Sequence, residues 1–297
     1  MSKLLSFAVA ALIIGAAVPT VRAETDWSKV AQTLGKEGTV QPGNVYRVGF
    51  PRSDLHVMLD GVTLAPGFAL GGWLAFEPMR DGAMVMGDLV LTQDEITPVM
   101  KKFEEGGIEI TALHNHLLRA EPMTLYLHVL GHGDPVKLAQ ALHAGLALSK
   151  TPLQAAAQPA AAPPAIDFDT GAVDKAMGYK GKDSGGIYQF TVSRAKPVTE
   201  DGMEIPAAMG SAIGINFQPT GGGKAAITGD FVLADKEVNP VIKALEAGGI
   251  EITALHSHML SEQPHLFFMH FWANDDAVKL ARGLHAALAR MDVKKSG

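Results

Sequence analysis

The sequence predicts an α+β protein made of two homologous tandem domains, each a mainly antiparallel sheet with a helix–β-hairpin–helix unit. The first observation is an internal repeat, because residues 87–148 align without gaps on residues 229–290, with 32 of 62 positions identical. The second is a series of short apolar runs bounded by Gly and Pro, which is typical of strands. The third is a pair of helical patterns that enclose a predicted hairpin in each copy.

The chain begins with a predicted secretory signal peptide over residues 1–23. Lys3 precedes an apolar run from Leu4 to Val18, and the segment ends in small residues up to Ala23. The run is too short to span a bilayer comfortably. We therefore expect cleavage before Glu24, a periplasmic or secreted protein, and no stable membrane anchor after cleavage.

Two repeat domains are expected to follow, over residues 25–150 and 167–292. Between them, residues 151–166 are rich in Ala and Pro and carry no charge, which is typical of a linker.

Each element of the first repeat follows from a local pattern. In the helix over 93–105, Ile96, Val99 and Phe103 keep helical spacing, and Gly106 and Gly107 end it. Asp134 is a good N-cap for the last helix, which reaches about residue 148. The other expected elements are a short helix over 27–35, strands over 45–50, 55–64, 69–76 and 83–91, and a hairpin of strands 108–118 and 123–130 that turns at Glu121-Pro122.

Composition excludes several functional classes. The 297 residues include no cysteine, so disulfides, thiolate catalysis, cysteine-bound zinc and iron–sulfur clusters are excluded. The net charge of −6 argues against nucleic acid as a partner, since binding phosphates needs a basic surface.

Histidines gather on one face of the predicted hairpin in each copy. Residues i and i+2 of a strand point to the same side, so His114 and His116 share a face, and a turn centred on Pro122 places His116 opposite His128. Three converging imidazoles suit a divalent transition metal, most readily zinc or copper. The second copy repeats the trio, which predicts a second such site at His256, His258 and His270.

Neighbouring residues supply the remaining candidates. Aromatic side chains on the same face predict an apolar pocket wall formed by Tyr126, Phe268 and Trp272. Glu121 is a candidate extra ligand or base in the first copy, where the second copy has Gln263, although solvated turn residues have the same pattern. His143 and His285, on the last helix of each copy, are interpreted as packing residues or supports for a ligand shell.

The repeated ALH-x-H…P…H block, followed by Asp and the helix VKLAxxLHAxLA, resembles the exported bacterial family of domain of unknown function 1259, the LppY/LpqO group. The resemblance covers nearly the whole chain after the signal peptide and implies export and a duplicated domain. It implies no activity. The lipid anchor of the mycobacterial members does not carry over, because this chain has no cysteine.

A shorter motif is similar to that of LytM-type zinc endopeptidases. The order HxxxD…HxH is present as His56, Asp60, His114 and His116, which would make His56, Asp60 and His116 ligands and His114 the base. The second copy has no histidine in the corresponding region, and the glycine-rich setting of those enzymes is missing.

Three functions therefore stay open. The first is binding of a metal ion or a small ligand through the hairpin histidines, and the second is metal-dependent hydrolysis. The third is a structural or interaction role without a metal. Because no general base is present in both copies, the sequence favours binding, and it does not decide whether the protein is an enzyme.

Overall fold

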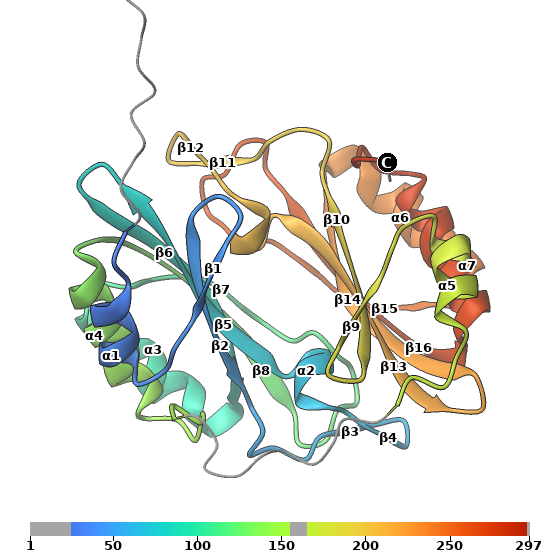
Figure 1. The fold of residues 1–297 in the computed structure, drawn as a ribbon, viewed down its shortest axis with the longest axis horizontal. Helices are drawn as coiled ribbons and strands as arrows, with labels where there is room; N and C mark the ends of the chain where they lie inside the picture. The colour runs from blue at the N-terminus through green and yellow to red at the C-terminus, as the bar shows by residue number, and fades with distance from the viewer. Residues whose placement is uncertain (1–24, 155–164, 296–297) are drawn as a thin grey trace, which may run out of the picture.

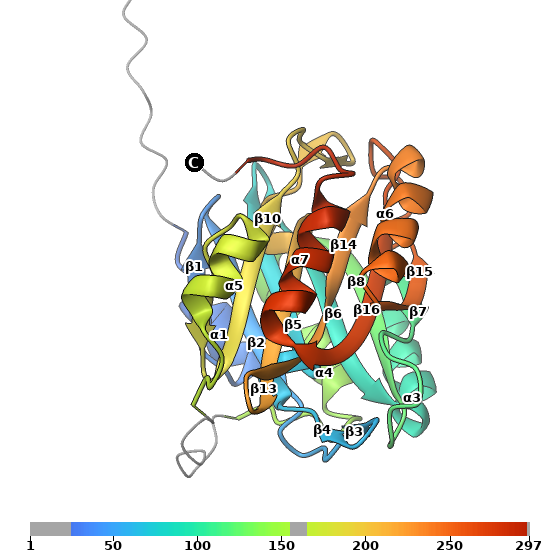
Figure 2. The same ribbon diagram turned by 90° about the vertical axis from the view of Figure 1, so that its right-hand side faces the viewer.

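Two six-stranded antiparallel sheets pack face to face, and three helices cover the outer side of each sheet (Figures 1 and 2). The structure is a computed structural model and describes residues 25–154 and 165–295. Each half of the chain forms one sheet with its helices, so the protein consists of two tandem homologous α+β domains, as the sequence predicts.

The first repeat forms one sheet with the strand order β1-β2-β5-β6-β8-β7. Its strands are β1 (Thr39–Gln41), β2 (Val45–Pro51), β5 (Gly71–Met79), β6 (Gly82–Thr92), β8 (Thr124–Gly133) and β7 (Glu109–His114). Its outer helices are α1 (Ser28–Leu34), α3 (Gln93–Glu105) and α4 (Pro135–Leu146).

The second repeat has the same arrangement, with the strand order β9-β10-β13-β14-β16-β15. Its strands are β9 (Lys182–Ser184), β10 (Ile187–Ser193), β13 (Ala212–Gly221), β14 (Lys224–Leu233), β16 (Phe267–Asp276) and β15 (Glu251–His256). Its outer helices are α5 (Thr170–Met177), α6 (Asp235–Ala247) and α7 (Ala277–Leu288).

The prediction of a strand over residues 55–64 is wrong. This stretch folds into a small hairpin of β3 (Met58–Leu59) and β4 (Val62–Thr63), followed by α2 (Pro66–Ala69). Asp60 and Gly61 adopt φ values of 46° and 80° between the two strands. Two consecutive residues with positive φ make the tight turn that an Asp-Gly pair favours, and this turn interrupts the strand.

Apolar helix faces build an outer core in each repeat. On α3 the side chains of Ile96, Val99 and Phe103 are buried against the sheet, and on α4 Leu138 and Leu142 join them. This arrangement follows from the 3.6-residue period, which places these positions on one side of each helix.

A buried ion pair fixes the start of the middle helix in each repeat. Arg194 donates to Glu237 of α6 over 2.7 Å and to the carbonyl oxygen of Val232, and both charged side chains are almost fully buried. The first repeat places Arg52 and Glu95 in the same way, and there Asp54 makes a second ion pair with the arginine.

Each repeat sends the segment after its second strand against the other repeat. The hairpin β3–β4 and α2 pack on Ala226 and Trp272 of the second sheet. In return, β11 (Thr199–Glu200), β12 (Met203–Glu204) and the short helix η1 (Ala207–Met209) adjoin the first sheet, where Met209 joins the cluster that contains Met86. This exchange fixes the two inner sheet faces against each other.

Two predicted segments involve residues outside the described part of the chain. The signal peptide lies there entirely, and the linker does so over residues 155–164. In the described part, no helix is both long and apolar enough to cross a membrane.

Candidate metal centre

The predicted hairpin exists in each repeat, with a different register from the expected one. In the first repeat, β7 pairs with β8 so that His114 lies opposite Tyr126 and Ala112 lies opposite His128. The prediction that His116 lies opposite His128 is therefore wrong, because β7 ends at His114 and the pairing is centred on Ala120 rather than on Pro122. The pairing differs by an even number of residues, so the histidines stay on one side of the hairpin.

All six hairpin histidines meet between the two sheets, in one cluster rather than in two separate sites. Each imidazole stacks on one from the other repeat, with ring centroids 3.5 Å apart for His114 and His256. The outer pairs are His116 with His270 at 3.6 Å and His128 with His258 at 3.8 Å. Exchanging each histidine for its counterpart in the other repeat reproduces the same three pairs, so the cluster has an approximate twofold axis at its central pair.

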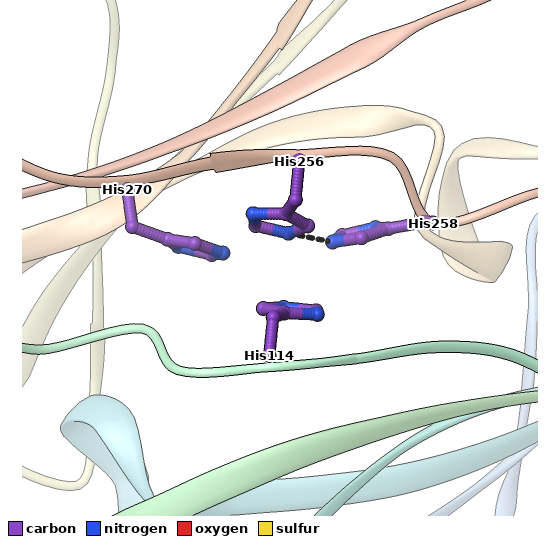
Figure 3. A group of neighbouring side chains, drawn as sticks. All are labelled: His114, His256, His258 and His270. Carbon is purple, nitrogen blue, oxygen red and sulfur yellow. Dashed lines mark hydrogen bonds between the residues drawn. The ribbon is translucent and has the colours of Figure 1, made fainter.

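Two groups of nitrogen atoms within this cluster are close enough to hold a metal ion. One consists of His114 with all three histidines of the second repeat, and Figure 3 shows His114 facing them from the opposite strand. The other consists of His114, His116 and His128. In both groups the candidate ligand atoms lie within 4.8 Å of one another. The second group is the trio predicted for the first repeat, and because His114 belongs to both groups, the two candidate sites are not independent of each other.

Two carboxylates that the sequence analysis missed complete the surroundings. Asp88 of β6 lies 3.7 Å from Nε2 of His128. Asp230 of β14 lies 3.8 Å from Nε2 of His270 and 3.9 Å from Nε2 of His258. A signal was present, since both belong to an identical Gly-Asp pair at equivalent positions of the repeats.

Burial keeps the imidazoles neutral. It lowers the pKa of His114 to about 4 and that of His270 to about 3, and it takes the pKa values of His116, His128 and His258 well below the usual 6.5. Neighbouring imidazoles add to the effect, because a charge on one ring repels a charge on the next. At neutral pH the rings therefore offer lone pairs, and a metal ion has no proton to displace from them.

The carboxylates are affected in the opposite direction. Burial raises the pKa of Asp88 to about 7, against the effect of the Arg47 guanidinium, and raises that of Asp230 well above its usual value. The charged form of Asp230 is further disfavoured by Asp88. The centre thus holds two carboxyl groups whose ionisation a cation would favour.

Many polar atoms of the centre are buried without a hydrogen bond. Leaving a buried polar atom unpaired costs free energy, so such atoms are rare in folded proteins. Among the described residues they include both ring nitrogens of His114, Nε2 of His116, His128 and His270, Nδ1 of His256, and Oδ1 of Asp88 and Asp230. These donor atoms fit a bound metal ion, which would satisfy several of them at once.

Aromatic rings close two sides of the cluster. Tyr126 stacks on His116 with ring centroids 3.2 Å apart, and its hydroxyl donates to the carbonyl oxygen of Ala69. Phe268 stacks on His258 at 3.6 Å. The third expected wall residue, Trp272, packs near Phe68, and its indole N–H donates to Asp60.

The other sequence candidates lie outside both histidine groups. The side chains of Glu121 and Gln263 are exposed, and their backbones pair with Met58 and Thr199. On the outer helices, Nδ1 of His143 lies 3.3 Å from the carbonyl oxygen of Leu34, and Nδ1 of His285 lies 2.8 Å from that of Met177. Both histidines thereby contact the end of the first helix of their repeat.

The ligand set implied by the LytM-type motif is not assembled. His56 is exposed, and Asp60 forms an ion pair with Arg119 and accepts a hydrogen bond from Trp272. Neither residue belongs to a group with His114 or His116 among the described residues. The peptidase interpretation therefore has no site in this fold.

Comparisons with known proteins identify a family. The family described as Domain of Unknown Function (DUF1259) matches residues 28–148 and 171–290. No curated protein matches the chain.

Three solved structures show a distant likeness. A trimeric bacterial microcompartment shell protein, PduB, is 13% identical, with 88% of this chain and 97% of that chain covered and a TM-score of 0.22. EtuB from Clostridium kluyveri is 11% identical, with 84% and 90% covered and a TM-score of 0.20. The ethanolamine utilization protein EutL from Leptotrichia buccalis is 11% identical, with 86% and 95% covered and a TM-score of 0.18.

Proposed function

The chain belongs to the DUF1259 family, whose domain it carries twice, and we propose that it binds a divalent transition metal in one centre that both repeats build. The observation that carries this proposal is the set of buried imidazole nitrogens and carboxylate oxygens without hydrogen bonds, gathered where the sheets meet. Neutral imidazole is a good ligand for zinc, copper, nickel and iron.

His114 is central to the proposed centre. It belongs to both groups of candidate ligands, and both of its ring nitrogens are buried without a hydrogen bond. Asp88 and Asp230 lie beyond the histidines and would offset the charge of a bound cation. The group of four histidines combines His114 of the first repeat with three histidines of the second, so this group needs both repeats.

Zinc titration of the chelator-treated protein tests the proposal. We expect saturable binding at neutral pH and a higher melting temperature, because free zinc at about 100 times its dissociation constant stabilises the folded state by about 2.7 kcal/mol. His114→Ala should weaken binding by more than the about 10–100-fold typical of residues that only support ligands. His56→Ala is the matched control, since His56 is exposed and belongs to neither group.

Two outcomes would contradict the proposal. One is the absence of saturable binding of zinc, copper or nickel by the wild-type protein at neutral pH. The other is equal affinity in the wild-type protein and the His114→Ala variant.

We also propose that the protein acts outside the cytoplasm. The support is the pattern of Lys3, the apolar run up to Val18 and the small residues before Glu24. N-terminal sequencing of the protein from a periplasmic extract should begin at Glu24. A chain that keeps Met1 and stays in the membrane fraction would contradict export with cleavage.

A further inference from the structure

A small pocket opens beside the histidine cluster, on the side of His128 and His258. It is lined mainly by sulfur-containing and aromatic side chains rather than by carboxylates or amides. Its lining includes Trp73, Met86, Met209, Met259, His128 and His258. Met86 belongs to the first repeat, whereas Met209 and Met259 belong to the second, so the pocket exists only where the repeats meet.

The thioethers distinguish this side of the cluster from its twofold counterpart. At the aligned positions the other repeat has Thr228 in place of Met86 and Leu117 in place of Met259. Packing alone would be served by leucine, as at residue 117. Methionine adds a soft, polarisable sulfur atom at these places.

One polar side chain at the pocket lacks a partner. The His128 side chain is only 7% exposed, and its Nε2 makes no hydrogen bond, with Asp88 at 3.7 Å. His258, whose ring stacks on that of His128, has its Nε2 2.9 Å from Nε2 of His256. The ring of His128, which carries this unpaired nitrogen, therefore lines the pocket together with the three methionines.

We propose that this pocket is a soft-donor site for the cuprous ion, Cu(I), with thioether sulfur from the three methionines and imidazole nitrogen from His128. Soft thioether ligands select Cu(I) over hard cations such as magnesium and calcium. The inference rests on the proposed function only in that His128 and His258 belong to both sites.

One cationic side chain lies close to the pocket. The Arg47 guanidinium lies 4.0 Å from the centre of the Trp73 ring and donates to the carbonyl oxygen of Ala208, next to Met209. The guanidinium repels a monovalent ion half as strongly as a divalent ion at the same place, while Asp88, 3.7 Å from Nε2 of His128, attracts either ion.

Anaerobic titration with Cu(I) against a colorimetric Cu(I) chelator tests the proposal on the full-length protein. The variant carries Met86→Leu, Met209→Leu and Met259→Leu, which keep the side-chain volume and remove the sulfur. The control carries Met84→Leu, Met177→Leu and Met291→Leu, which change methionines of the same core that do not line the pocket. Zinc affinity and the melting temperature are measured on all three proteins, and single variants replace the triple variant if it does not fold.

We expect the pocket variant to bind Cu(I) at least about tenfold more weakly than both the wild-type and the control protein, with zinc affinity unchanged. X-ray absorption of the Cu(I) protein should show copper–sulfur scattering that the pocket variant loses. Unchanged Cu(I) affinity, or a spectrum with nitrogen ligands alone, would overturn the soft-donor site and leave the zinc centre standing. If zinc fails to bind while Cu(I) binding depends on the methionines, the soft-donor site stands and the divalent centre falls.

Discussion

The stability of the metal-free Asp88→Asn variant, relative to that of the wild-type protein, should increase as the pH rises. Burial raises the pKa of this carboxyl from 3.8 to about 7 in the folded state. Between these two values the folded protein keeps a proton that the unfolded chain has lost, so stability falls as the pH rises through this window and is constant above it. The gap corresponds to at most about 4 kcal/mol at pH 8, or 1.36 kcal/mol for each pH unit.

Asparagine has nearly the same shape as aspartate and cannot ionise, so the variant does not lose this stability as the pH rises. We expect the free energy of unfolding of Asp88→Asn, relative to wild type, to rise by about 3 kcal/mol from pH 4.5 to pH 8. Urea unfolding at pH 4.5, 6 and 8 with a chelator present measures it. A constant difference from altered hydrogen bonding does not affect the comparison, because only its pH dependence is predicted.

The control is Asp81→Asn, in the exposed turn between β5 and β6, which should show no such trend. With zinc present the wild-type protein should be more stable than Asp88→Asn, because the ionised Asp88 lies beside His128 and offsets the charge of the cation. A stability difference that is flat between pH 4.5 and pH 8 would refute the argument that the Asp88 carboxyl is destabilised by burial.

Two further predictions concern the framework. Glu237→Gln should lower the free energy of unfolding, measured with urea, by about 3–5 kcal/mol because it leaves Arg194 buried and unpaired. Glu95→Gln should lower it by less, since Asp54 still pairs with the buried Arg52. Equal losses in the two variants would contradict this reasoning. Brief digestion with proteinase K should cut first within residues 151–166 and yield two fragments of repeat size, as exposed linkers do; first cuts inside a repeat would contradict the linker.

The repeats and the shared face of the histidines could be predicted because both depend on local patterns. Identity at a constant spacing reveals the duplication, and alternation along a strand gives the side on which His114 of β7 lies, with His116 two residues past the end of that strand. The pairing of His114 with Tyr126 could not be predicted, because the strands pair symmetrically about Ala120, within the loop over residues 115–123, and not about Pro122. The backbone of Glu121 in this loop pairs with Met58, so the loop conformation depends on a distant segment that the local sequence does not reveal.

The joining of six histidines into one cluster was beyond local reasoning for a different reason. It depends on which sheet faces meet, and this is decided by the segments that each repeat packs on the other, such as Phe68 near Trp272. The role of Asp88 in the centre could not be predicted because it lies in an otherwise apolar strand, β6, where a lone polar residue resembles a solvated position. Its identity with Asp230 becomes informative only once the strands are known to face each other.

Duplication and later divergence have different consequences for the centre. The duplicated trio supplies matching donors across the approximate twofold axis, which accounts for the central pair of His114 and His256. A perfectly symmetric centre would have equivalent sides. The substitutions that break the symmetry, with Met86 and Met259 on one side, surround the pocket beside His128. The histidines are thus retained in both copies, whereas the methionines that we propose as further donors stand on one side of the cluster only.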